Sequence, residues 1–79
     1  MSEAITKNSA SYEEREKECF EVISIAERDL ENNVLPFVSE ERKEKINKSF
    51  ETISEIDDLS ERAFILMTYV RELKVILNL

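Results

Sequence analysis

Apolar residues recur at intervals of three and four along three stretches of the chain, and such intervals predict helices. The first stripe consists of Cys19, Ile23, Ala26, Leu30 and either Asn33 or Val34. Just before it, Ser11-Tyr-Glu-Glu14 fits a capping box, in which the serine and a glutamate three residues later satisfy the first free backbone N–H groups. The pattern therefore predicts a first helix over residues 12–33.

The second stripe predicts a helix over residues 40–56. It consists of Ile46, Phe50, Ile53 and either Ile56 or Asp57. Ser39 precedes it as an N-cap, followed by two glutamates where the helix dipole favours negative charge. Glu41 with Lys45, and Glu44 with Lys48, are i,i+4 pairs that indicate a solvent-facing side.

Two breaks separate the three helices. Pro36 disfavours helical geometry at Leu35, and Asn32-Asn33 supply residues that tolerate the left-handed conformation at a helix end. The apolar connector 34–38 is expected to plug the end of the bundle. The second break is Asp57–Glu61, where Asp58 or Ser60 caps the third helix.

The third stretch carries the clearest pattern in the chain, an a/d seam at alternating spacings of four and three. The seam is Leu59, Ala63, Leu66, Val70, Leu73 and Leu77. A second stripe of Ile65, Tyr69 and Ile76, with Phe64 and Met67 to the sides, makes the middle of this helix apolar nearly all round and predicts burial on several faces. The alternative, a buried strand over residues 64–70, has neither flanking turns nor a strand to pair with.

These patterns predict an all-α protein, a small two- or three-helix bundle. Residues 1–10 lack periodicity and are expected to form a flexible N-terminal segment, followed by a single helical domain over residues 11–79. A chain of 79 residues buries little core, so we expect dimerisation through the C-terminal helix to complete it. The predicted self-association or partner interface is Ala63, Leu66, Val70, Leu73, Leu77, Ile65, Tyr69 and Ile76.

The composition excludes several classes of site. The chain has no glycine, so it lacks phosphate-cradling loops, the dinucleotide fingerprint and the EF-hand loop. It has no histidine, so it lacks a Ser-His-Asp triad and the common zinc motifs. Its single cysteine, Cys19, has no partner for a disulfide and is interpreted as a small core residue. We therefore predict no enzyme activity, no catalytic residues, no cofactor and no metal.

The net charge of −7 is unevenly distributed. Residues 1–33 carry −5, residues 34–58 carry −3 and residues 59–79 carry +1, which makes the third helix the natural centre. The basic residues of 42–48 are interleaved with glutamates, so direct nucleic-acid binding is not expected. An acidic face of Glu14, Glu18 and Glu21 is a candidate docking surface for a partner with a basic DNA-binding surface, unless it serves only solubility.

This make-up is typical of a non-enzymatic protein-binding regulator, a small acidic antagonist or adaptor of the antirepressor or inhibitor kind, that self-associates and docks on another protein. The alternatives are a small export or assembly chaperone covering an apolar segment of a client, and a purely structural oligomer subunit. The longest apolar run, residues 63–70, is too short to span a bilayer. With no signal-like segment near Met1, a cytoplasmic location without membrane contact is expected.

Overall fold

The computed structural model describes the backbone of residues 2–79 and the side chains of residues 13–79. Its elements are α1 (Ser2–Asn33), the 3-10 turn η1 (Leu35–Phe37), α2 (Glu40–Ser54) and α3 (Leu59–Ile76). No strand occurs within residues 2–79, and the predicted all-α class with three helices is confirmed. The alternative strand over residues 64–70 is wrong, because that segment lies inside α3.

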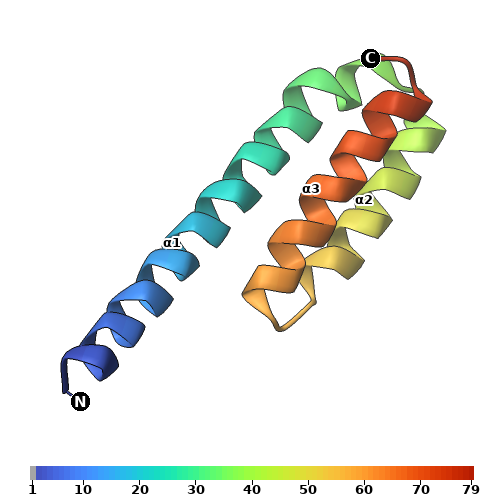
Figure 1. Cartoon of the computed structure of the whole chain (residues 1–79). Helices are drawn as coiled ribbons and strands as arrows, with labels where there is room; N and C mark the ends of the chain where they lie inside the picture. Colours follow the sequence, from blue (N-terminus) through green and yellow to red (C-terminus); the bar gives the residue numbers. More distant parts are fainter. Residues whose placement is uncertain (1) are drawn as a thin grey trace.

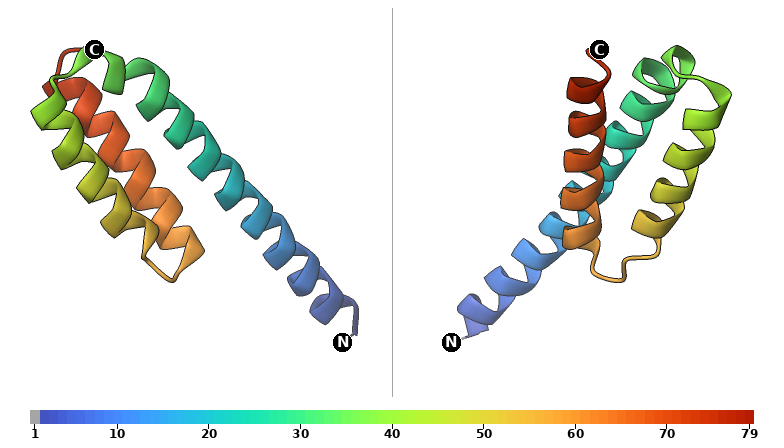
Figure 2. Two further views of the ribbon diagram at one scale, coloured as in Figure 1. Left: turned by 180° about the vertical axis from the view of Figure 1, so that it is seen from behind. Right: turned by 90° about the vertical axis from the view of Figure 1, so that its right-hand side faces the viewer.

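The chain runs up, down and up again, so α1 and α3 are parallel and α2 is antiparallel to both (Figure 1). At 1.5 Å per residue, the 32 residues of α1 extend about 48 Å, whereas the 18 residues of α3 extend about 27 Å. The first half of α1 consequently projects past the α2–α3 connection (Figure 2). This projection accounts for the elongated dimensions of 56 × 21 × 16 Å.

The beginning of α1 differs from the prediction. The helix starts at Ser2, so Ser11 lies within it and is not its N-cap. The reason is that residues 2–10 contain neither glycine nor proline, and nothing there stops a helix from extending backwards. The division into a flexible segment 1–10 and a domain 11–79 stays a prediction.

The core is built from the predicted stripes. Its buried apolar residues are Ala26, Leu30, Val34, Ile46, Ile53, Ala63, Leu66, Val70 and Leu73. The two helices with the most extensive mutual contact are α1 and α3, and α2 closes the core from one side with Ile46 and Ile53. Phe50, Ile56 and Leu77 pack against this core while remaining half-buried.

The connections follow the predicted breaks, with two corrections. Ser39 caps α2 by accepting a hydrogen bond from the backbone N–H of Arg42 at 3.3 Å. Asn33 does not adopt the left-handed conformation, because Val34 ends the helix in an ordinary negative-φ conformation before η1. The connector does not fully plug the bundle either, since Val34 is buried but Phe37 is 67% exposed.

Two further predictions about helix ends and surfaces are corrected. Asp58 is the N-cap residue of α3, but its side chain makes no capping hydrogen bond. The bonds at this connection include one from Arg62 Nε to the Ile56 carbonyl, at 2.9 Å. On α2, neither predicted i,i+4 pair forms, and the ion pair within the described side chains of this helix joins Glu40 to Lys43 at 3.2 Å.

Candidate functional site

The two faces of α3 are not equally covered, contrary to the predicted burial on several faces. One face packs into the core, but Phe64, Met67, Val75 and Ile76 remain 63%, 41%, 75% and 70% exposed. The reason is geometric: α1 and α2 are the helices that pack against α3, and they leave part of its surface uncovered, including these four apolar side chains. The uncovered surface next to α1 is the starting point for the site.

An apolar groove runs between α1 and α3. It consists of two adjoining hollows of about 640 and 510 Å³, which share Val22 and Met67 and so form one continuous depression. None of the residues that line it belongs to α2, so the groove opens on the side that α2 leaves free. We call it the α1–α3 groove.

The α1–α3 groove has a closed floor and exposed walls. The buried Ala26, Ala63 and Val70 form its floor and belong to the core. Its apolar wall residues are Val22, Ile25, Phe64, Met67 and Val75. A floor that is already packed keeps the chain folded, while the walls offer apolar surface that nothing in the monomer covers.

The C-terminal end of the groove is shaped by an asparagine. Asn78 has φ 60°, the left-handed conformation that usually needs glycine. Its N–H bonds to the Val75 carbonyl at 3.2 Å, and the N–H of Leu79 bonds to the Lys74 carbonyl at 2.8 Å, which together make a Schellman motif. This turn brings Leu79 back against the groove as one of its lining residues.

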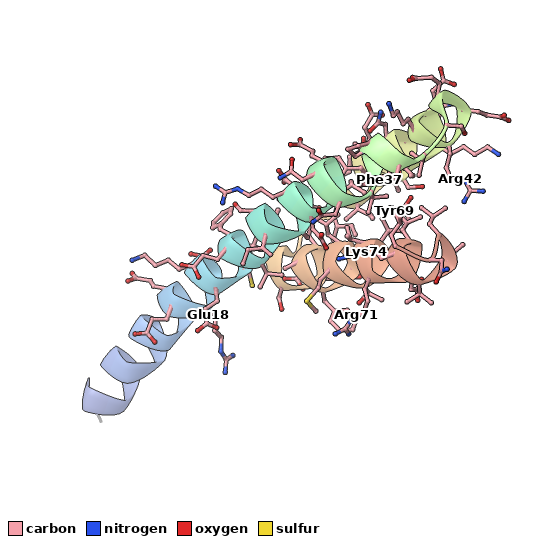
Figure 3. The ribbon with its side chains drawn as sticks, turned by 90° about the horizontal axis from the view of Figure 1, so that it is seen from above. Glu18, Phe37, Arg42, Tyr69, Arg71 and Lys74 are labelled. Carbon is pink, nitrogen blue, oxygen red and sulfur yellow. The ribbon has the colours of Figure 1, made fainter. Side chains whose placement is uncertain are left out.

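One ion pair joins the two helices beside the groove. Lys74 Nζ lies 3.2 Å from both carboxylate oxygens of Asp29, and Asn33 Nδ2 donates to Asp29 Oδ1 at 2.6 Å. The hydrogen bond from Asn33, helped by Lys74, lowers the pKa of Asp29 against a smaller opposing effect of burial. The pair fixes the upper end of α1 against α3, and Figure 3 shows Lys74 reaching towards α1.

The two ends of the groove carry opposite charge. The end near the α2–α3 connection is lined by four carboxylates, Glu16, Glu18, Asp57 and Asp58, against one cation, Arg15. The other end is lined by Arg71 and Lys74 against one carboxylate, Asp29. Because Asp29 is already paired with Lys74, the unpaired side-chain charge at this end is that of Arg71, which points away from α1 in Figure 3.

The structure places the predicted interface residues in three environments. Ala63, Leu66, Val70 and Leu73 are buried in the core of the single chain. Ile65, Tyr69 and Leu77 are half-buried and pack against that core, and Ile76 is exposed. Their role in self-association or partner binding stays a prediction.

The predicted acidic face lies on the middle part of α1, just before Val22 at the centre of the groove. Glu14, Glu18 and Glu21 are all exposed. Of the three, Glu18 lines the groove, and Glu14 and Glu21 are not among its lining residues. The structure therefore connects one member of the acidic face to the groove.

The sequence patterns did not identify the groove walls as a site. Val22 and Ile25 recur three residues apart on α1, and Phe64 and Met67 do so on α3, which is the spacing of a second helical stripe. Charged residues interrupt both stripes, so each is short when considered alone. Only the parallel packing of α1 on α3 places the two short stripes side by side.

Other kinds of site find little support in the described part of the chain. Among its side chains there is no group of three or more His, Cys, Asp or Glu residues that could hold a metal ion. Cys19 is half-buried and lines the groove, so it is less enclosed than the predicted core residue. None of the described helices is both long enough and apolar enough to cross a membrane.

Comparison with known proteins leaves the chain without an assigned family. No family model matches the sequence, and neither a curated protein nor a solved structure is detectably similar to it.

Proposed function

We propose that this protein is a non-enzymatic, protein-binding regulator that works as a small acidic adaptor or antagonist, and that the α1–α3 groove is its binding surface. The observation that carries the proposal is the row of exposed apolar side chains along the groove, which consists of Phe64, Ile25, Met67 and Val75. Large exposed apolar patches on small proteins are typical of interaction sites.

The shape of the groove supports a helix as the bound element. The two helices run in the same direction and leave an elongated depression between them, and an amphipathic helix fills such a depression with side chains at i, i+3, i+4 and i+7. From Arg15 to Asp29 the groove follows α1 for about 21 Å at 1.5 Å per residue, which is roughly four helical turns. The proposed occupant is therefore an amphipathic helix of a protein chain.

The experiment is a comparative co-purification from the native cell with the wild-type chain and two variants. Met67→Glu places a charge in the middle of the groove, where both hollows meet. Phe37→Glu is the matched control, because Phe37 is 67% exposed but does not line the groove. We expect a second protein to be retained by the wild type and by Phe37→Glu, and to be lost with Met67→Glu.

The retained protein is then purified, and its affinity and its own activity are measured with each variant. Loss of that activity on addition of the wild-type chain supports a regulator. A partner that is insoluble alone and soluble in the complex indicates a chaperone instead. Recovery of only the chain itself, or equal recovery of other proteins with all three variants, contradicts the proposal and leaves a structural oligomer subunit.

A further inference from the structure

We infer that the α1–α3 groove binds the same groove of a second copy of this chain, in an antiparallel arrangement with a two-fold axis between Val22 and Met67. This inference concerns the same groove as the proposed function, and it names a second copy as the occupant of that groove in the protein without its partner. It is carried by three features of the groove: its charge distribution, the position of its centre, and its length.

The charges favour a second copy turned end for end. One end of the groove is acidic, through Glu16, Glu18, Asp57 and Asp58, and the other end exposes Arg71. In an antiparallel pair the acidic end of each copy faces the basic end of the other copy, so this favourable contact occurs twice. In a parallel pair acidic ends would face each other, and like charges across an interface disfavour association. The groove is thus complementary to itself in one orientation only.

The centre of the groove is apolar, as a two-fold contact requires. Val22 and Met67 line both hollows and therefore lie at the midpoint. In a two-fold pair with α1 facing α1 and α3 facing α3, each Met67 meets the Met67 of the second copy, and each Val22 meets the second Val22. A side chain near a two-fold axis packs against the same side chain of the second copy. The flexible thioether of methionine and the branched alkyl group of valine can both do so without a charge clash.

The register of the charged residues agrees with this centre. Glu18 precedes Val22 by four residues, and Arg71 follows Met67 by four residues. Because α1 and α3 are parallel, Glu18 lies about 6 Å below the midpoint and Arg71 about 6 Å above it at 1.5 Å per residue. The two-fold rotation brings Arg71 of the second copy to the level of Glu18. Both side chains are exposed and line the groove. Arg71 of the second copy then lies over α3 and Glu18 over α1, so the two opposite charges attract each other diagonally across the groove without forming a direct ion pair.

The occupant also matches the groove in length and chemistry. A second copy presents two helices with the same apolar walls over the same distance, so each groove covers the exposed Ile25, Phe64, Met67 and Val75 of the other. The product is a four-helix arrangement of two α1 and two α3 helices, with α2 on the outside of each half. Such bundles are a common way to bury helices with two apolar stripes.

The test measures molecular mass by light scattering and sedimentation from about 1 μM to about 1 mM, a range over which a reversible dimer shows its dissociation constant. We expect the wild type and Phe37→Glu to dimerise. Met67→Glu places two carboxylates close together on the two-fold axis, and their repulsion is expected to keep this variant monomeric. Its helical content in circular dichroism should be unchanged, because Met67 is partly exposed in the single chain. A wild-type chain that stays monomeric throughout overturns the inference.

Exchanging the charges at Glu18 and Arg71 tests the antiparallel orientation. Because the double variant is expected to restore binding, the result does not depend on whether one variant fails to fold. Glu18→Lys and Arg71→Glu are each expected to weaken the dimer by about tenfold, because each places like charges at the same level. The double variant restores opposite charges and is expected to return the dissociation constant to within about threefold of wild type. Additive weakening in the double variant overturns the antiparallel arrangement.

The outcomes separate this inference from the proposed function. A monomer that loses a foreign protein partner on Met67→Glu refutes the second copy as occupant and retains the protein-binding function. A dimer that depends on Met67 but retains no other protein confirms the inference and refutes the regulator.

Discussion

At the scale of single residues, stability depends on a few fully buried side chains. Ile46, Leu66, Val34 and Val70 are the largest residues with almost no exposed surface, and they come from α2, α3 and the connection that follows α1. No buried side-chain polar atom among residues 13–79 lacks a hydrogen-bond partner. The folding free energy of this part of the chain therefore depends mainly on how well these alkyl groups fill the space between helices.

Leu66→Ala is expected to lower the free energy of unfolding by about 2–5 kcal/mol, because it removes a side chain that is only 1% exposed and leaves a cavity. A domain of this size has only about 3–5 kcal/mol to lose, so the variant should be largely unfolded at room temperature. Urea unfolding followed by circular dichroism checks this. Phe37→Ala, at a 67% exposed position, should change the midpoint little, and equal loss in both variants would contradict the described core.

The lowered pKa of Asp29 makes one contribution to stability depend on pH. A carboxyl group whose pKa is lower in the folded than in the unfolded state stabilises the folded protein at pH values above its unfolded pKa, which is near the ordinary value of 3.8. This stabilisation is lost as the pH falls through the pKa of the folded state. Asp29→Asn should therefore lower the unfolding free energy at pH 7 by at most about 1 kcal/mol, because the pair is partly exposed.

The difference between Asp29→Asn and the wild type should shrink below pH 3.8 and vanish once Asp29 is protonated in both states. Urea midpoints measured from pH 7 down to pH 2 provide the check. Glu31→Gln is the control, since Glu31 is exposed on the same helix and forms no ion pair within the described side chains. A constant difference across this range would mean that the ion pair does not cause the effect.

At the scale of elements, the starts of α1 and α2 differ in what holds them. Ser39 closes the first turn of α2 through its side chain, whereas Ser11 lies within the helical turns of α1. The same residue type therefore has opposite effects at the two positions. A hydroxyl at an N-cap satisfies a free backbone N–H, but in a helix interior serine is a weaker helix former than alanine.

Ser39→Ala is accordingly expected to lower the unfolding free energy by about 1 kcal/mol, and Ser39→Asp should restore it by providing another capping oxygen. Ser11→Ala should leave stability unchanged or raise it by a few tenths of a kcal/mol. Thermal and urea unfolding of the three variants provide the measurement. A loss in Ser11→Ala equal to that in Ser39→Ala would place a helix start at residue 11.

The elements also show how far the sequence predicts the fold. The stripes on all three helices identified the core residues, because a period of 3.6 fixes which side chains share a face. The ends at Asn33 and Leu59 were predictable from Pro36 and from the acidic connection. The start of α1 was not, because residues 2–10 carry no stop signal and capping chemistry at Ser11 does not oblige a helix to begin there.

The candidate site was less predictable than the fold. The sequence predicts the seam on α3 as an interface, and this stays a prediction; in the single chain Ala63, Leu66, Val70 and Leu73 are buried in the core. The exposed apolar walls of the groove come from shorter stripes on two different helices. Periodicity in one helix cannot show which neighbour lies beside it. The groove is a consequence of the parallel contact between α1 and α3, which only the tertiary structure supplies.

At the scale of the whole molecule, the inferred dimer has a distinctive shape. The midpoint of the groove at Val22 lies about 30 Å along α1 from residue 2, so an antiparallel pair centred there is about 60 Å long. The single chain is already 56 Å long. Dimerisation should therefore double the mass and thicken the particle without lengthening it appreciably.

Small-angle X-ray scattering of the dimer should accordingly give a maximum dimension near 60 Å, close to that of a monomeric groove variant such as Met67→Glu. The monomer should show a radius of gyration near 15.8 Å, the value for its Cα atoms. A maximum dimension near twice the monomer length would instead indicate association end to end through the projecting part of α1. That result would exclude the side-by-side arrangement.

The most extensive helix contact in the molecule joins segments that are distant along the chain, as the sequence separation of 45 between Asp29 and Lys74 illustrates. In kinetic terms, α2 and α3 form a local hairpin that can assemble quickly, whereas α1 reaches α3 only after a long loop has closed. The conformational entropy lost in that closure is recovered only when α1 and α3 pack together. We therefore expect the docking of α1 to limit the folding rate of this small helical protein, with α2 as the segment that connects the two helices.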